Sequence, residues 1–142
     1  MGWQNCHLHA FSAYGIQYGR RSSELDFVDE TTAVLEVLVK EGGHLDYDYD
    51  FGDSWEHRVT VERRMTAEAD HHYPACVDGA GACPPEDCGG PGGYEDLKRT
   101  LQDSADPEHE DLLRWLGLET AADFDPAHFD LREINRQLRT LD

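Results

Sequence analysis

The feature of this sequence that most restricts its fold is a pair of alternating segments joined by a short turn. In LDYDYDF, at 45–51, apolar and aromatic residues alternate with three aspartates, and a second alternation follows in WEHRVTVE at 55–62. A period of two is that of a β-strand with one buried face. Gly52-Asp53-Ser54 between the two segments is typical of a turn. The pattern therefore predicts a β-hairpin over about 45–63.

Two weaker segments precede this hairpin. WQNCHLHAFSAY, at 3–14, alternates in part and predicts a strand that carries His7 and His9 on the same face. TTAVLEVLVK, which ends at Lys40, is rich in Val, Leu and Thr and fits either a strand or a short helix.

Helical patterns dominate the last third of the chain. One helix is expected over about 94–102, and a second from about Asp106, with Pro107 in its first turn, to Gly117. A third is expected over about 131–141, where four apolar residues fall on one stripe. These elements together indicate an α+β fold, with a mostly antiparallel sheet and C-terminal helices packed on it.

Length and charge limit the class of protein. A chain of 142 residues suits a single domain, here 1–142, and 30 acidic residues against 12 Lys plus Arg give a net charge of −18. This charge disfavours direct binding to a nucleic-acid backbone. The sequence shows neither a membrane-spanning apolar run nor a signal peptide, so we expect a cytoplasmic protein without a membrane partner.

Three of the four cysteines lie in a long segment, 70–93, that is rich in Gly, Pro and Asp. A loop of this length normally has a function or is held by something. In a reducing compartment, clustered thiols favour a metal over a disulfide. We therefore predict Zn²⁺ bound by Cys76, Cys83 and Cys88, the alternative being a cluster of thiols without metal.

A structural zinc site needs a fourth protein ligand. His57 shares its strand face with Trp55 and Val59, so its ring points inward, either as a core residue or as a ligand. We choose His57 as the fourth ligand; the rivals are His71, His72 and Cys6.

A second group of residues fits catalysis rather than structure. His7 and His9, two residues apart on one predicted strand, can hold a metal if carboxylates such as Asp50, Asp53 or Glu86 complete the site. The alternative is that both are ordinary strand histidines that form hydrogen bonds with neighbouring residues. A triad of Asp53, Ser54 and His57 is disfavoured, because strand parity sends Ser54 to the opposite face.

The three aspartates of the hairpin project from one face of their strand. Most such faces are merely solvated and keep a protein in solution. The functional interpretation is that Asp46, Asp48 and Asp50 form a surface that docks onto a basic partner, such as a nucleic-acid-binding protein.

Several blocks resemble, in order, the plasmid pRiA4b ORF-3-like family, whose members are often described as passenger proteins of an insertion element. They are GW and HLHAF near the start, YDYDFGDSWEHRVTVE at 47–62, YPACVDGAGACPPEDCGGPGGYEDL at 73–97, and LRWLG with FDPAHFDLREIN toward the end. The resemblance implies an α+β fold and a mobile-element or phage context. Family members usually begin with a further strand and helix, so it also implies a shortened domain. The uncovered sheet edge would then favour a homo-oligomer.

Two functions follow from these observations. A set of three thiolates is typical of closed structural sites. We therefore expect a zinc-stabilised acidic module that binds another protein, in preference to an enzyme. The alternative is a metal-dependent hydrolase that uses His7, His9 and nearby carboxylates.

Overall fold

The computed structural model describes residues 2–21, 24–33 and 40–141. The chain divides into two compact units. One, here called the sheet unit, comprises 3–65 and 87–95, and the other, the helical unit, comprises 1–2, 66–86 and 96–142. The segment 34–39, for which the sequence left strand and helix open, lies outside the described residues.

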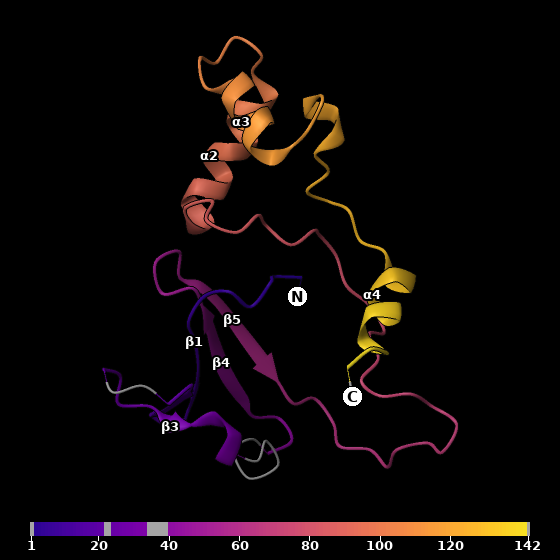
Figure 1. Ribbon diagram of the computed structural model, residues 1–142. Coiled ribbons are helices and arrows are strands. Elements are labelled where there is room, and N and C mark those ends of the chain that lie inside the picture. The colour runs from indigo at the N-terminus through magenta and orange to yellow at the C-terminus, as the bar shows by residue number, and fades with distance from the viewer. Residues whose placement is uncertain (1, 22–23, 34–39, 142) are drawn as a thin grey trace. The chain divides into compact units, whose positions relative to one another are not determined.

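The sheet unit contains a five-stranded mixed sheet (Figure 1). Its strand order is β3-β2-β1-β4-β5, and every pairing is antiparallel except that of β2 with β3. This confirms the predicted α+β class and the mostly antiparallel sheet. The strands are β1 (His9–Ala13), β2 (Ile16–Gly19), β3 (Val28–Asp29), β4 (His44–Tyr49) and β5 (Trp55–Thr60), with a 3₁₀ turn, η1 (Glu30–Thr32), after β3.

The predicted hairpin is confirmed as β4 and β5. Tyr49 lies opposite Trp55, and Tyr47 lies opposite His57. On this face Tyr49 is 1% exposed and Leu45 is 4% exposed. The alternation in sequence therefore reports burial of one face of the hairpin.

The first strand is shorter than predicted, because regular pairing begins only at His9. Asn5 has a positive φ of 56°, which interrupts an extended chain before the sheet begins. The β1–β2 turn consists of Tyr14 and Gly15, both with positive φ, as a two-residue hairpin turn requires. His7 therefore lies outside the sheet, whereas His9 lies within it.

The helices are α2 (Gly90–Gln102), α3 (His109–Leu116) and α4 (Leu131–Leu138), with a 3₁₀ turn, η2 (Ala121–Asp123), before α4. All three predicted helices are present. Helix α2 begins at Gly90 rather than near Tyr94, so the glycine-rich run forms its first turn. None of the helices in the described ranges is long and apolar enough to cross a membrane.

The core of the helical unit lies where α2 and α3 present buried leucines. Leu97, Leu101 and Leu113 are all at most 7% exposed. Asp106 accepts a hydrogen bond from the backbone N–H of Glu108 at 2.9 Å, although regular helix begins only at His109. Gly117, with a φ of 70°, ends α3 in the left-handed conformation.

Helix α4 is less buried than its apolar stripe suggests. Asp130 caps it by accepting hydrogen bonds from the N–H groups of Arg132 and Glu133. None of its residues is fully buried, and Leu131 is 37% exposed. Much of the surface of α4 is therefore open to solvent.

Candidate functional site

The turn of the β4–β5 hairpin, in the sheet unit, is held by hydrogen bonds of its own. Asp50 and Ser54 both have positive φ, and the N–H of Ser54 donates to the carbonyl oxygen of Asp50 at 2.6 Å. The N–H of Gly52 donates to Oδ1 of Asp50 at 3.0 Å. Short polar residues tolerate this conformation because their side chains bond to nearby backbone. The turn thereby fixes the Asp50 side chain.

A second segment packs against this turn. Oδ2 of Asp53 accepts a hydrogen bond from the N–H of Gly89 at 3.0 Å. Gly90 approaches Asp53 so closely that a Cβ at Gly90 would overlap the Asp53 carbonyl oxygen. Gly90 also has a positive φ of 68°. Only glycine satisfies both conditions, so this contact brings Asp87, three residues earlier, to the hairpin turn.

His7, Asp50 and Asp87 form the candidate site. His7 Nε2 lies 3.2 Å from Oδ1 of Asp87, and His7 Nδ1 lies 3.8 Å from Oδ2 of Asp50. One ligand atom from each of the three residues lies within 4.8 Å of the other two. The side chain of Asp50 is 13% exposed and that of Asp87 is 71% exposed, so the cluster has a buried side and an open side.

His9 has a different acidic partner. Its Nε2 lies 2.9 Å from Oε2 of Glu30, and its ring packs against Phe11 and Tyr47. The residue is 9% exposed. His7 and His9 therefore each pair with their own carboxylates.

The remaining acidic candidates from the sequence are Asp53 and Glu86. Asp53 supports the backbone at Gly89, as described above, and Glu86 belongs to the helical unit. The acidic partners that the sequence did not single out are Asp87 and Glu30. The position of Asp87 directly before Cys88-Gly89-Gly90 could have indicated it, because glycines in a row are typical of backbone that packs closely against another segment.

His57, the predicted fourth zinc ligand, lies among aromatic rings. It is edge-on to Trp3 and tilted against Tyr47. Its Nδ1 lies 3.3 Å from the Tyr47 carbonyl oxygen. Trp3 in turn stacks on Tyr49, with ring centroids 4.9 Å apart. The inward orientation predicted from strand parity is thus present.

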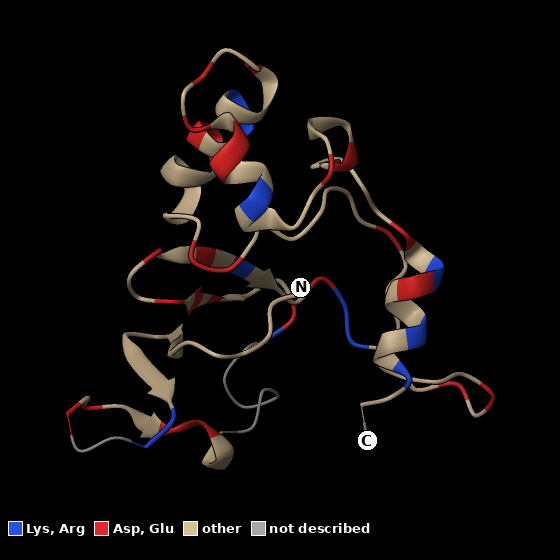
Figure 2. Ribbon diagram, turned by 45° about the horizontal axis from the view of Figure 1, so that its top comes forward, with Lys and Arg blue, Asp and Glu red and all other residues tan. Residues whose placement is uncertain are grey.

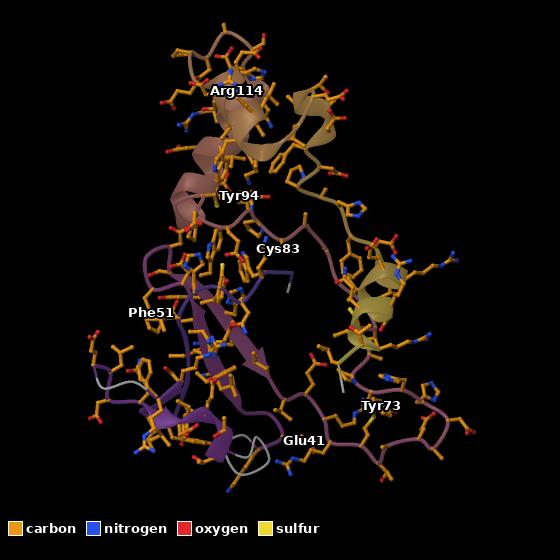
Figure 3. The ribbon with its side chains drawn as sticks, viewed as in Figure 1. Glu41, Phe51, Tyr73, Cys83, Tyr94 and Arg114 are labelled. Carbon is orange, nitrogen blue, oxygen red and sulfur yellow. The ribbon has the colours of Figure 1, made fainter. Side chains whose placement is uncertain are left out.

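The predicted cysteine ligands are divided between the two units. Cys76 and Cys83 belong to the helical unit, whereas Cys88 and His57 belong to the sheet unit. All three cysteines are partly buried, and Figure 3 labels Cys83. Burial raises the pKa of the Cys88 thiol, and the Asp53 carboxylate adds to this effect. The zinc site itself stays a prediction.

The alternative fourth ligands have their own contacts. Sγ of Cys6 lies 3.8 Å from the Tyr49 hydroxyl. Nδ1 of His71 lies 3.0 Å from Oε2 of Glu68, and His72 is exposed. Both histidines belong to the helical unit together with Cys76 and Cys83.

The aspartates of β4 are not equivalent charges. Asp46 pairs with Arg58 directly opposite at 2.9 Å, which lowers the pKa of Asp46 and raises that of Arg58. Asp48 lies opposite Glu56, and burial together with this neighbour raises the pKa of Asp48. The acidic face is therefore partly neutralised at one end and partly buried in the middle.

Comparison with known proteins identifies the relatives of this chain. An uncharacterized protein of Sinorhizobium fredii, y4hQ, is 34% identical to this chain over 145 residues, and the match covers 99% of this chain and 73% of that protein. The crystal structure of a protein of unknown function from Methanosarcina mazei, MM3350, is 35% identical with a TM-score of 0.79, and the match covers 92% of this chain and 74% of that one. The family model described as plasmid pRiA4b ORF-3-like protein matches residues 1–133. The chain therefore belongs to the plasmid pRiA4b ORF-3-like family.

Proposed function

We propose that the protein binds a divalent metal ion through His7, Asp50 and Asp87 and uses this site in hydrolysis. The observation that carries the proposal is the convergence of these three side chains within 4.8 Å. They come from three separate parts of the sheet unit: the segment before β1, the hairpin turn, and the segment before α2. Such convergence makes a site from residues far apart in sequence.

The donor set suits a particular group of metals. Two carboxylates and one imidazole favour Mn²⁺, Fe²⁺ or Zn²⁺ over softer ions. Three protein ligands leave coordination positions open, as catalytic sites require. A metal bound here would supply a water molecule of lowered pKa.

The side chains themselves have distinct tasks. Asp50, fixed by the N–H of Gly52 and largely buried, holds the inner side of the His7 ring. Asp87, which is mostly exposed, forms the side from which a substrate can approach. His7 lies between the two carboxylates and would supply the imidazole ligand of the metal.

Calorimetric titration of the full-length protein with Mn²⁺ tests the metal site. We expect His7→Ala and Asp50→Asn to weaken binding at least tenfold, because each removes one of three ligands. His44→Ala, an exposed histidine of the same unit, is the matched control and should bind as the parent does. Equal affinity in all four proteins would refute the site.

Turnover is tested separately with chromogenic phosphate and carboxylate esters in the presence of Mn²⁺. Hydrolysis that His7→Ala abolishes and His44→Ala retains supports the hydrolytic role. If the parent binds Mn²⁺ but hydrolyses none of these esters, the metal site stands and the hydrolytic role fails.

A second candidate function is the zinc-stabilised module that binds a basic protein. What favours it is the absence of helix and strand from Val61 to Gly89, a stretch that contains Cys76, Cys83 and Cys88. A segment of this length needs another means of ordering, which a metal supplies. Metal analysis followed by a thermal melt of Cys83→Ser tests it: bound zinc and a lowered melting temperature are expected, and a metal-free parent that melts like the variant would exclude it.

A further inference from the structure

A groove in the helical unit has a charge opposite to that of the whole chain. It lies between α4 and the coil of 70–76, and its volume is about 700 Å³. Arg132 and Arg136 line it from α4, Arg139 lines it from the C-cap of that helix, and His71 and His72 line it from the coil. Three of the 12 Lys and Arg residues in the chain thus lie within eight positions. Figure 2 shows Lys and Arg as blue bands on α4.

Helix geometry explains why the three arginines share one groove. Positions separated by four and by seven residues lie on one face of a helix. The coil is held beside that face by Asn135, which accepts a hydrogen bond from the Cys76 N–H at 2.8 Å and donates one to the Cys76 carbonyl at 2.9 Å. Figure 3 shows the coil, with Tyr73 labelled, running next to α4. The groove therefore has two walls joined by a specific contact.

The acidic groups around the groove are largely engaged. Glu133 pairs with Arg136 at 3.3 Å, and Glu68 pairs with His71 at 3.0 Å. Asp130 is occupied as the cap of α4. Asp70 also lines the groove, so with Glu133 two carboxylates stand against three guanidinium groups. The C-terminal end of α4 contributes only about half a negative charge, so the groove stays positive.

We propose that this groove binds a compact, multiply charged phosphate, such as the oligophosphate of a nucleotide. Guanidinium groups match phosphate oxygens in two-point contacts and stay charged at all physiological pH values. Residues 132 and 139 are about 10 Å apart along the helix axis, at about 1.5 Å per residue, which suits two or three linked phosphates better than one. A volume of this size also lies within the usual range for small-molecule sites.

The charge of the rest of the chain separates a compact ligand from a nucleic-acid strand. A strand that leaves the groove meets a protein with a net charge of −18, which repels further phosphates. A ligand that ends within the groove escapes this repulsion. This inference concerns residues of the helical unit alone and is independent of the proposed metal site.

Titration of the full-length protein with inorganic tripolyphosphate tests the proposal. We expect saturable one-to-one binding, weakened at least tenfold in Arg136→Gln/Arg139→Gln. Arg114→Gln, an exposed arginine paired with Asp111 on α3, is the matched control and should leave the affinity unchanged. Arg139→Lys should retain part of the affinity, because it keeps the charge but loses the planar donor pair.

Further ligands distinguish the sources of phosphate. We expect ATP to bind about as tightly as tripolyphosphate, and inorganic phosphate more weakly. Absence of saturable tripolyphosphate binding, or an equal loss in Arg114→Gln, would overturn the proposal. Tighter, Arg136-dependent binding of a single-stranded oligonucleotide would overturn the assignment to a compact ligand.

Discussion

The His7–Asp50–Asp87 cluster and the α4 groove differ in charge and in the way they are held. In the cluster, the two aspartates are held by backbone that a turn fixes at Asp50 and a glycine contact fixes near Asp87. In the groove, one Asn135 side chain joins two walls, and the arginines are exposed. The first arrangement resists change in the backbone, whereas the second depends on a few side-chain hydrogen bonds. The comparison also shows that a strongly acidic chain can concentrate positive charge locally.

The largest predicted effect is on the stability of the sheet unit, at the contact that positions Asp87. Gly90→Ala should lower the free energy of unfolding by about 4 kcal/mol, because a Cβ there overlaps the Asp53 carbonyl and the positive φ is strained. Gly92→Ala is the control: nothing lies near its Cβ, and alanine is the better helix former, so stability should rise by up to about 1 kcal/mol. Urea unfolding measures both. Equal effects of the same sign would show that the Gly90 contact does not hold the turn.

A smaller effect is expected in the second region. Asn135→Ala removes both hydrogen bonds to Cys76 and should lower the free energy of unfolding by about 1–2 kcal/mol. It should also weaken tripolyphosphate binding, because the coil is released from α4. Gln137→Ala, an exposed residue on the same helix, should change neither property. Thermal melts and calorimetry measure both variants. Unchanged tripolyphosphate affinity in Asn135→Ala would show that the Asn135–Cys76 hydrogen bonds do not shape the groove for binding.

The smallest effect concerns pH. Hydrogen bonds from the N–H groups of Glu133 and Arg132 lower the pKa of Asp130 below its ordinary value of 3.8. Because the folded-state pKa is the lower one, the cap stabilises α4 fully above pH 3.8 and loses this effect as the pH falls through the folded-state value. Asp130→Asn still accepts hydrogen bonds but does not titrate, so this acid-dependent loss should disappear.

Amide chemical shifts of Arg132 and Glu133, followed by NMR during acidification, measure the change. The parent should show both amides moving together below pH 3.8, and the Asn variant should show neither. A parent whose two amide shifts stay constant throughout would contradict the cap as a titrating group.

The sequence predicted those parts of the fold that follow from local periodicity. The alternation at 45–62 predicted the hairpin and its buried face, and caps and apolar stripes predicted three helices. The first strand was predicted too long, because nothing in WQNCHL reveals that Asn5 takes a positive φ. The early start of α2 was missed because glycine is a poor helix former, and here the contact at Gly90 outweighs that preference.

The sites were harder to predict than the fold. His7 and Asp50 were recognised as candidates by residue type, but Asp87 joins them only through the Gly90 contact, which is long-range. His9 was grouped with His7 by spacing, whereas its partner Glu30 follows the short parallel pairing of β2 with β3. The α4 arginines share a face by helical period, yet the coil that faces them could not be placed from local patterns. Contacts between distant segments leave little trace in one sequence.

The sheet unit is assembled from two pieces of chain, 3–65 and 87–95. During synthesis, the ribosome must therefore deliver Gly90 before the hairpin turn gains its contact with the second piece, and the intervening 21 residues, 66–86, join the two pieces. A fragment that stops at Met65 lacks Gly89, Gly90 and Asp87. Truncation at Met65 would keep every strand that the structure describes and still remove Asp87 from the candidate site.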